Sequence, residues 1–183
     1  IEMATASGLP LLQPEERNPW LTSTYGTGEL IRDALERGCR KFLIAIGGSA
    51  TNDGGMGLLQ ALGFRFLDAE GQELPGCGSS LSRIEQIDTS GALAALKECL
   101  FTVACDVTNP FYGREGAAYV FAPQKGADAE MVEALDQGLR HFAQLIQTTQ
   151  GIAIDQLPGA GAAGGLRGGL VAVRQARLRP GIE

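Results

Sequence analysis

The hydrophobic pattern of the chain alternates between short apolar runs and amphipathic segments. Residues 41–46 (KFLIAI) and 100–107 (LFTVACDV) are almost continuously apolar, which is typical of buried strands. Residues 28–37 and 128–150 carry apolar side chains along one helical face, and Asp128 is a natural N-cap for the second of these segments. The pattern therefore predicts strands that alternate with helices.

Shorter segments complete the predicted elements. We expect a hairpin over residues 64–73 with Gly71 in its turn. We also expect a short strand at 152–155 and helices at 56–62, 79–84, 91–97 and 166–176. Together these elements predict an α/β architecture in one domain, residues 1–183, with a mixed sheet of several short strands and flanking helices. The hairpin and the many short pieces disfavour a regular doubly wound sheet.

Composition narrows the class of protein. The 183 residues are 44% hydrophobic and 20% charged, which suits one globular domain. The net charge of −6 disfavours binding to a nucleic-acid backbone, and no apolar run approaches the ~20 residues of a membrane span. The four cysteines lack Cys-x-x-Cys spacing and there is one histidine, so we expect neither a zinc site nor a histidine-dependent triad.

A glycine-rich polar loop follows the first predicted strand. Residues 47–57 (GGSATNDGGMG) lead into a predicted helix, where backbone N–H groups favour anions, and the glycines allow a ligand to approach the backbone. The short polar side chains of this loop exceed the needs of one helix cap; they are Ser49, Thr51, Asn52 and Asp53. We expect a ligand site here, with a plain capped turn as the alternative. A Walker phosphate loop is excluded because no Gly-Lys-Ser/Thr follows.

Other polar residues have two interpretations each. Thr24 and Thr27 precede a predicted helix and suit either N-capping or ligand contact. Asp106 ends the second apolar run and Asn109 follows it, where ligands gather in open α/β sheets; the alternative is that Asp106 caps the following turn. Lys125 ends a short helix and suits either the helix dipole or an anion.

Residues 159–164 (GAGAAG) match the Gly-x-Gly-x-x-Gly pattern of dinucleotide sites. Pro158 stands where a strand should meet the loop, and few residues follow for the rest of a βαβ unit. A nicotinamide-binding site is therefore disfavoured. Two interpretations remain, a glycine-rich helix start near a ligand and close helix packing through Gly161, Gly164 and Gly165.

Five stretches of the chain resemble the bacterial glycerate kinase family, in the family's order. They are TSTYGTGELI (22–31), GGSATNDGGMG (47–57), ACDVTNP (104–110), FAPQKGA (121–127) and PGAGAAGGL (158–166). Members of that family are longer, with further motifs on both sides. The chain therefore resembles the central, inserted domain of a two-domain glycerate kinase, and we expect the N- and C-terminal parts of the other domain to lie outside it.

The resemblance implies an ATP- and Mg²⁺-dependent enzyme of the cytoplasm that phosphorylates D-glycerate, with the 2-hydroxyl favoured and a homodimer as a possible assembly. Asp106 is then the first candidate for general base or Mg²⁺ contact, Asp53 is its rival, and Lys125 neutralises phosphate. The implied substrate contacts are Ser49, Thr51, Asn52, Thr24, Thr27 and Asn109. The implied phosphate contacts are Gly47, Gly48, Gly54, Gly161 and Gly164.

Two other classes of function remain. The first is a domain that binds a small anion without catalysis, and we expect this behaviour of the chain in isolation. The second is a nicotinamide-dependent oxidoreductase, which would rest on residues 159–164 alone.

Overall fold

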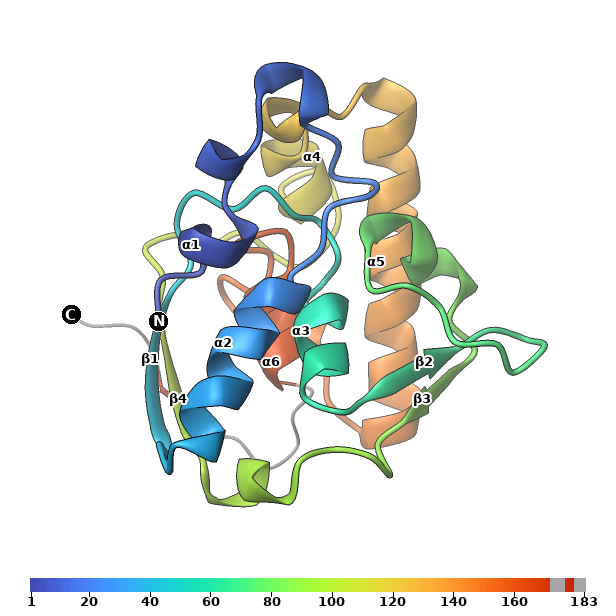
Figure 1. The fold of residues 1–183 in the computed structure, drawn as a ribbon. Coiled ribbons are helices and arrows are strands. Elements are labelled where there is room, and N and C mark those ends of the chain that lie inside the picture. Colours follow the sequence, from blue (N-terminus) through green and yellow to red (C-terminus); the bar gives the residue numbers. More distant parts are fainter. Residues whose placement is uncertain (172–176, 180–183) are drawn as a thin grey trace.

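The computed structural model describes residues 1–171 and 177–179, and their strands form two separate sheets (Figure 1). The larger sheet is parallel and has the order β1-β4-β5, and the smaller one is the antiparallel pair of β2 and β3. The bounds are β1 Lys41–Ala45, β2 Arg65–Leu67, β3 Gln86–Asp88, β4 Leu100–Ala104 and β5 Arg177–Arg179. Because Ala45 pairs with Ala104, β1 and β4 end at the same edge of the sheet.

Helices lie between and beside the two sheets. In Figure 1 the long helix α5 stands on the opposite side of the molecule from β1 and β4, with α2 and α3 between them. The α-helices are α1 Ala4–Ser7, α2 Tyr25–Glu36, α3 Met56–Ala61, α4 Ala117–Phe121, α5 Ala129–Gln150 and α6 Leu166–Val171. The 3₁₀ helices are η1 Leu9–Leu11, η2 Pro14–Glu16, η3 Gly78–Arg83, η4 Ala94–Glu98, η5 Pro123–Lys125 and η6 Ile154–Gln156.

The core forms where these layers meet. Along β1, Phe42 and Ile44 are buried while their neighbours are more exposed, as the period of a strand requires. Phe42 stacks on Phe101 of β4 with ring centroids 4.9 Å apart. Helix α2 meets α3 at Gly28, where a Cβ atom would lie 2.5 Å from the carbonyl oxygen of Leu58. A larger residue at Gly28 would therefore separate the two helices.

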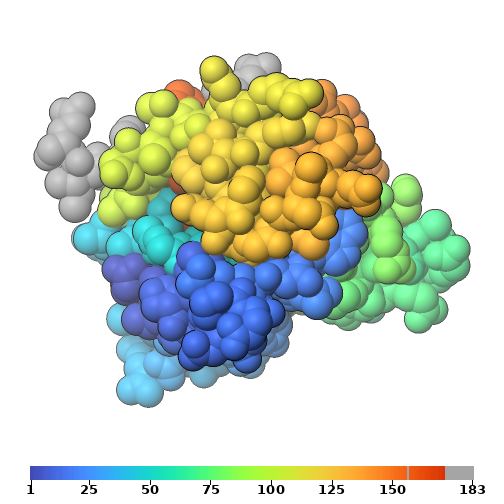
Figure 2. Space-filling view, turned by 90° about the horizontal axis from the view of Figure 1, so that it is seen from above, coloured from blue at the N-terminus to red at the C-terminus, as the bar shows by residue number. Residues whose placement is uncertain are grey.

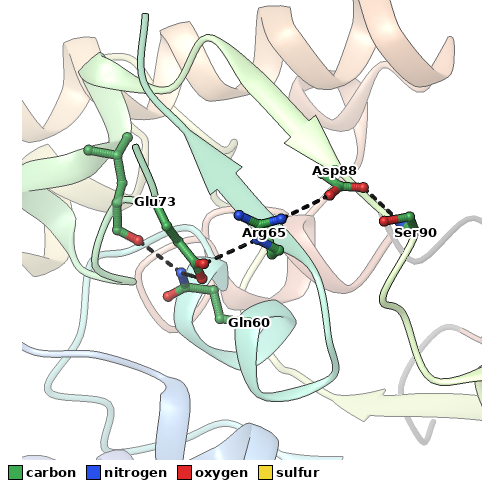
Figure 3. A network of polar contacts seen from close by, with 6 residues as sticks. Gln60, Arg65, Glu73, Asp88 and Ser90 are labelled. Atoms are coloured by element: carbon green, nitrogen blue, oxygen red, sulfur yellow. Dashed lines mark hydrogen bonds and ion pairs between the residues drawn. The ribbon is translucent and has the colours of Figure 1, made fainter. Parts of the chain in front are cut away.

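Arg65 of β2 organises the surface of the small sheet (Figure 3). Its guanidinium lies 3.2 Å from Oε2 of Glu73 and 3.6 Å from Oδ2 of Asp88, so it bridges the segments on either side of β2. Gln60 and Ser90 extend this network through Glu73 and Asp88. Ion pairs that are this exposed contribute little stability each.

The expected α/β architecture with short strands and flanking helices is confirmed. Parallel and antiparallel pairing, which we expected in one mixed sheet, occur in separate sheets among the described residues. The hairpin at 64–73 is confirmed by the antiparallel bridge between Leu67 and Glu73 and by the positive φ of 74° at Gly71. Asp128 caps α5 as predicted, since its Oδ1 accepts a 2.8 Å hydrogen bond from the Met131 N–H.

The strand predicted at 152–155 was wrong, and three predicted helices differ in type or in described extent. The segment 152–155 contributes to the 3₁₀ helix η6 instead of a strand, because no described strand pairs with it and the Leu157 N–H bonds locally to Ile154. The segments 79–84 and 91–97 also coincide with 3₁₀ helices, η3 and η4. The helix predicted at 166–176 is present up to Val171, and residues 172–176 lie outside the described residues. No helix within 1–171 and 177–179 has the length and apolar character needed to cross a membrane.

Candidate active site

A cavity of about 360 Å³ lies at the carboxyl ends of β1 and β4. Residues that directly follow these two strands supply two of its walls, as ligand sites in open α/β sheets do. The remaining wall comes from η1, the α4–η5 segment and the glycine-rich turn before α6. The lining residues are Leu9, Ile46, Gly47, Gly48, Ser49, Ala104, Cys105, Asp106, Val107, Phe121, Gln124, Lys125, Ala162 and Ala163.

The N-terminal segment holds the loop that follows β1. The N–H of Leu9 donates to the carbonyl of Gly48 at 2.8 Å, and the N–H of Ala50 donates to Ser7 at 3.0 Å. Seen from above, the N-terminal residues (blue) lie against the segment around α4 and η5 (gold) (Figure 2), where a Cβ atom on Gly126 would lie 2.3 Å from the carbonyl oxygen of Arg17. Two segments distant in sequence therefore meet beside the cavity and both contribute to its lining.

Lys125 carries the positive charge of the cavity. Its side chain is only 2% exposed, and Nζ donates to the carbonyl oxygen of Thr51 at 2.6 Å and to Oγ of Ser49 at 3.4 Å. Burial lowers the pKa of Lys125 to about 7, against the smaller opposite effect of the Asp53 charge. The charge of this ammonium is therefore sensitive to small changes in pH or to a bound anion near neutral pH.

Asp106 is the carboxylate of the cavity. It follows β4 by two residues, its side chain is exposed, and it is the one acidic residue that lines the cavity in the described part of the chain. It makes no hydrogen bond or ion pair with the described residues, so its oxygens are available to a ligand. A carboxylate within reach of a bound ligand is one of the groups that can act as a general acid or base.

Asp53 has different surroundings from Asp106. It is fully buried, and it accepts hydrogen bonds from the Thr24 N–H (2.8 Å), the Thr24 hydroxyl (2.7 Å), the Gly55 N–H (3.1 Å) and the Gly57 N–H (3.2 Å). Burial raises the pKa of Asp53, and these hydrogen bonds act in the opposite direction. Thr24 also accepts from the Leu58 N–H at 2.8 Å, so the pair ties the start of α2 to the start of α3.

A family model described as the glycerate kinase family matches residues 1–183.

The chain belongs to the glycerate kinase family.

Individual members of the glycerate kinase family share about half of their aligned residues with this chain. The chain is 50% identical over 183 residues to the glycerate 2-kinase of Escherichia coli (strain K12), and 50% identical to the glycerate kinase of Bacillus subtilis (strain 168). Each alignment covers 100% of this chain and 48% of the relative, so the chain spans about half the length of these relatives. A crystal structure described as a candidate glycerate kinase 2 from Salmonella typhimurium LT2 superposes with a TM-score of 0.94 at 50% identity, covering 98% of this chain and 48% of that chain.

The other predicted site residues of this glycerate kinase family member differ in their distance from the cavity lining. Gly47, Gly48 and Ser49 line it. Thr51 lies behind the lining, fully buried, and reaches the cavity through its carbonyl bond to Lys125. Thr27 is buried and its hydroxyl lies 2.8 Å from that of Ser7, a contact between α1 and α2.

The two predicted asparagines lie outside the cavity lining. The Nδ2 of Asn109 donates to the carbonyl of Glu115 at 2.8 Å, which closes the loop that follows β4. Asn52 is fully buried, and neither its Nδ2 nor its Oδ1 has a hydrogen-bond partner among the described residues. The bond to Glu115 explains the presence of Asn109 without a ligand. The side-chain amide of Asn52, in contrast, can still accept and donate hydrogen bonds.

Gly54, Gly161 and Gly164 serve close packing in this structure. A Cβ atom on Gly161 would lie 2.1 Å from the carbonyl oxygen of Pro110, and one on Gly164 would lie 2.0 Å from that of Thr51. Gly54 has a φ of 61° and donates its N–H to the Gly164 carbonyl at 3.0 Å. The packing interpretation of the Gly-x-Gly-x-x-Gly pattern therefore fits the structure, and η6 stands before it where a dinucleotide site needs a strand.

Several lining residues were not predicted from the sequence. Gln124 lines the cavity beside Lys125, and its place in the FAPQKGA motif was a usable signal. Leu9 also lines it, but only the backbone pairing with Gly48 brings Leu9 there, which no local pattern indicates. Ala163 lines it with a φ of 54°, the left-handed region that non-glycine residues rarely adopt.

A metal ion has limited support from the protein side. No group of three or more His, Cys, Asp or Glu residues that could hold a metal occurs within 1–171 and 177–179. The donor chemistry of the cavity, one available carboxylate at Asp106, fits Mg²⁺ when substrate phosphates and water supply its other oxygen ligands. Asp53 does not fit this role, because four donors already occupy its oxygens.

Proposed function

We propose that the chain forms the acceptor-substrate part of a glycerate kinase, which transfers the γ-phosphoryl group of ATP to the 2-hydroxyl of D-glycerate. The observation that carries the proposal is that an available carboxylate, Asp106, and a buried ammonium, Lys125, line one cavity in a member of this family. The name of the Escherichia coli relative, glycerate 2-kinase, supports the choice of hydroxyl.

Each residue then has a distinct task in the transfer. Asp106 accepts the proton of the attacking hydroxyl as the phosphoryl group arrives. Lys125 neutralises the carboxylate of glycerate or the charge of the transferring group. The N–H groups of Gly47 and Gly48 make no backbone hydrogen bond with the described residues, so they can donate to the same anion.

The proposal includes Mg²⁺ because kinases use ATP as its magnesium complex. When bound, it offsets the negative charge of the nucleotide phosphates. Asp106 is the residue of the cavity that would hold it, with the phosphates as the other ligands. General base and metal contact are thus competing tasks for the same carboxylate.

We further propose that residues 1–183 form one domain and that the rest of the enzyme completes the nucleotide pocket. The relatives are about twice as long as the segment that they share with this chain, which leaves ample length for such a part. Under this proposal the chain alone binds D-glycerate but does not release ADP from ATP. A homodimer and a cytoplasmic location stay predictions.

A small-anion-binding domain without catalysis is the second candidate, because the cavity supplies both a cation and available backbone N–H groups. The nicotinamide-dependent alternative loses its structural support, since the glycines at 161 and 164 are accounted for by packing against Pro110 and Thr51.

Calorimetric titration of the chain tests the proposal. D-glycerate, L-glycerate and Mg-ATP are titrated separately, with Lys125→Met as the variant that removes the cation and Lys97→Met as its exposed control. Saturable heat with D-glycerate, weaker heat with L-glycerate and loss in Lys125→Met alone are expected. Equal heat with both enantiomers would favour the anion-binding domain, and no heat with either would reject an acceptor site within this chain.

A further inference from the structure

Three lysines occur in the chain, and their surroundings differ sharply. Lys41 at the start of β1 and Lys97 in η4 are exposed. Lys125 is 2% exposed to solvent but lines a cavity of about 360 Å³. Among the three lysines, Lys125 is thus the one that lines this cavity, where a small molecule can reach it.

The contacts of Lys125 orient its nitrogen. A neutral amine has two N–H groups and one lone pair, and here the two acceptors within reach are the Thr51 carbonyl at 2.6 Å and the Ser49 hydroxyl at 3.4 Å. When both N–H groups are donated to these acceptors, the lone pair points away from the loop that carries them. Because burial lowers the pKa of Lys125 to about 7, the neutral amine is abundant near neutral pH.

Besides burial, which is the largest influence, charge affects how easily this nitrogen loses its proton. The Asp53 carboxylate favours the ammonium but is the smaller influence, and Asp106 lines the same cavity from the β4 side. An ordinary exposed lysine, with a pKa near ~10.4, is less than about 0.1% neutral at pH 7. The cavity therefore contains a neutral amine nucleophile, which an exposed lysine provides only in trace amounts at this pH.

The size and donors of the cavity select the reagent. About 360 Å³ admits a small ligand, and the N–H groups of Gly47 and Gly48 favour a phosphate or carboxylate. A small acyl phosphate combines such an anion with an electrophilic carbonyl carbon two bonds from phosphorus. Its phosphate group would occupy the anion-binding part of the cavity while its carbonyl lies near the amine.

We propose that Lys125 is a modification site at which small acyl phosphates acylate Nζ within the cavity. The lone pair of Nζ attacks the carbonyl carbon and forms the C–N bond, the C–O bond to phosphate breaks, and phosphate leaves with the electron pair. The nitrogen then gives up one proton to the solvent or to the departing phosphate. The product is a neutral amide, so the cavity loses its cation.

The acylation itself does not depend on the proposed function, whereas its consequence, loss of D-glycerate binding, rests on that function. The consequence follows because an amide nitrogen can neither carry charge nor donate two hydrogen bonds to the Ser49–Thr51 loop. Acylation would therefore switch off the acceptor site in proportion to the acyl phosphate present.

The test uses the folded chain and acetyl phosphate. Initial acetylation rates at Lys41, Lys97 and Lys125 are measured at pH 6, 7 and 8 by mass spectrometry, after digestion with a protease that cleaves at acidic residues. Lys125 is expected to react at least about tenfold faster than either exposed lysine at pH 7, with its rate levelling off above pH 7. In urea the three rates should converge. Comparable rates in the folded chain, or no label at Lys125, would overturn the proposal.

Protection experiments separate this proposal from the proposed function. Both D-glycerate and inorganic phosphate should slow the labelling of Lys125 and leave Lys41 and Lys97 unchanged. Fast labelling that phosphate slows but D-glycerate does not would uphold the modification site and reject the glycerate site. Stereoselective glycerate binding without preferential labelling would reject the modification site and leave the glycerate site standing.

Discussion

The carboxylate of Asp53 accepts hydrogen bonds from both the N–H and the hydroxyl of Thr24, at 2.8 and 2.7 Å. The two residues are 29 positions apart, and both are fully buried. Through this pair the glycine-rich loop is joined to the start of α2, and the Asp53 carboxylate is occupied before any ligand arrives. The two candidate acids therefore differ in their surroundings: the Asp53 carboxylate is bonded to the protein, whereas Asp106 makes no hydrogen bond or ion pair with the described residues.

Replacing Asp53 by Ala should lower the free energy of unfolding by roughly 3 kcal/mol or more, because each buried donor left without an acceptor costs roughly 1–3 kcal/mol. Urea denaturation followed by circular dichroism measures this. Thr24→Ser keeps the hydroxyl and should lose less than about 1 kcal/mol, whereas Thr24→Val should lose more. If Asp53→Ala unfolds with the wild-type free energy but no longer binds glycerate, Asp53 acts in ligand binding or catalysis and not in stability.

Replacing Asp106 by Asn should lower the turnover of the full-length kinase by roughly 100-fold or more, the usual effect of removing a general base. ADP release in a coupled assay measures turnover, and thermal unfolding should change little because the exposed Asp106 side chain makes no hydrogen bond or ion pair with the described residues. Asp33→Asn, on the exposed face of α2, serves as the control. Turnover near the wild-type level would remove Asp106 from the mechanism.

The affinity for D-glycerate should fall as the pH rises from 6 to 8.5. Anion binding needs the Lys125 ammonium, and its pKa of about 7 means that the charge is present below pH 7 and lost above it. The dissociation constant should rise by up to about tenfold per pH unit above that value. Calorimetry at a series of pH values measures it. Lys125→Met should bind weakly with a flat profile, and Lys97→Met should keep the wild-type profile; a pH-independent wild type would contradict the assignment.

Two glycines with positive φ form a matched pair for testing the packing around the site. Gly38 has a φ of 90°, and a Cβ atom added there would meet nothing within 4 Å, so Gly38→Ala should cost only the left-handed strain of roughly 1–2 kcal/mol. Gly164→Ala adds a 2.0 Å approach to the Thr51 carbonyl and should cost roughly 1–3 kcal/mol more.

Gly164→Ala should also weaken D-glycerate binding, because the displaced Thr51 carbonyl is the acceptor that holds Lys125. Urea denaturation and calorimetry on the same samples separate the two effects. Equal stability losses in the two alanine variants would show that the loop yields without strain, and the packing account of Gly164 would then be wrong.

Local patterns were sufficient where one segment determines its own environment. The apolar runs of β1 and β4, the face of α5 and its cap at Asp128 follow from periodicity and capping chemistry. The position of Asp106 at a strand end also placed it beside the cavity, since the carboxyl ends of parallel strands share an edge.

Local patterns could not show the partners that a distant segment supplies. Asp53 is as polar and as close to a helix start as a ligand-binding acid would be, but Thr24 occupies it. Gly161 fits a nucleotide pattern, but the carbonyl of Pro110 explains the absent side chain. Neither partner is visible within a window of sequence, so structural and ligand-binding roles for these residues could not be separated beforehand.

The bond between Lys125 and the loop after β1 has a consequence for how the protein matures. Ser49 and Lys125 are separated by 76 positions, and closing so long a loop is entropically unfavourable until the intervening core has assembled. On the ribosome, the glycine-rich loop emerges long before its ammonium partner and cannot bind an anion in the same way. The contact between Lys125 and Ser49 is thus made late in folding, and its presence reports that residues 49 to 125 have reached their native topology.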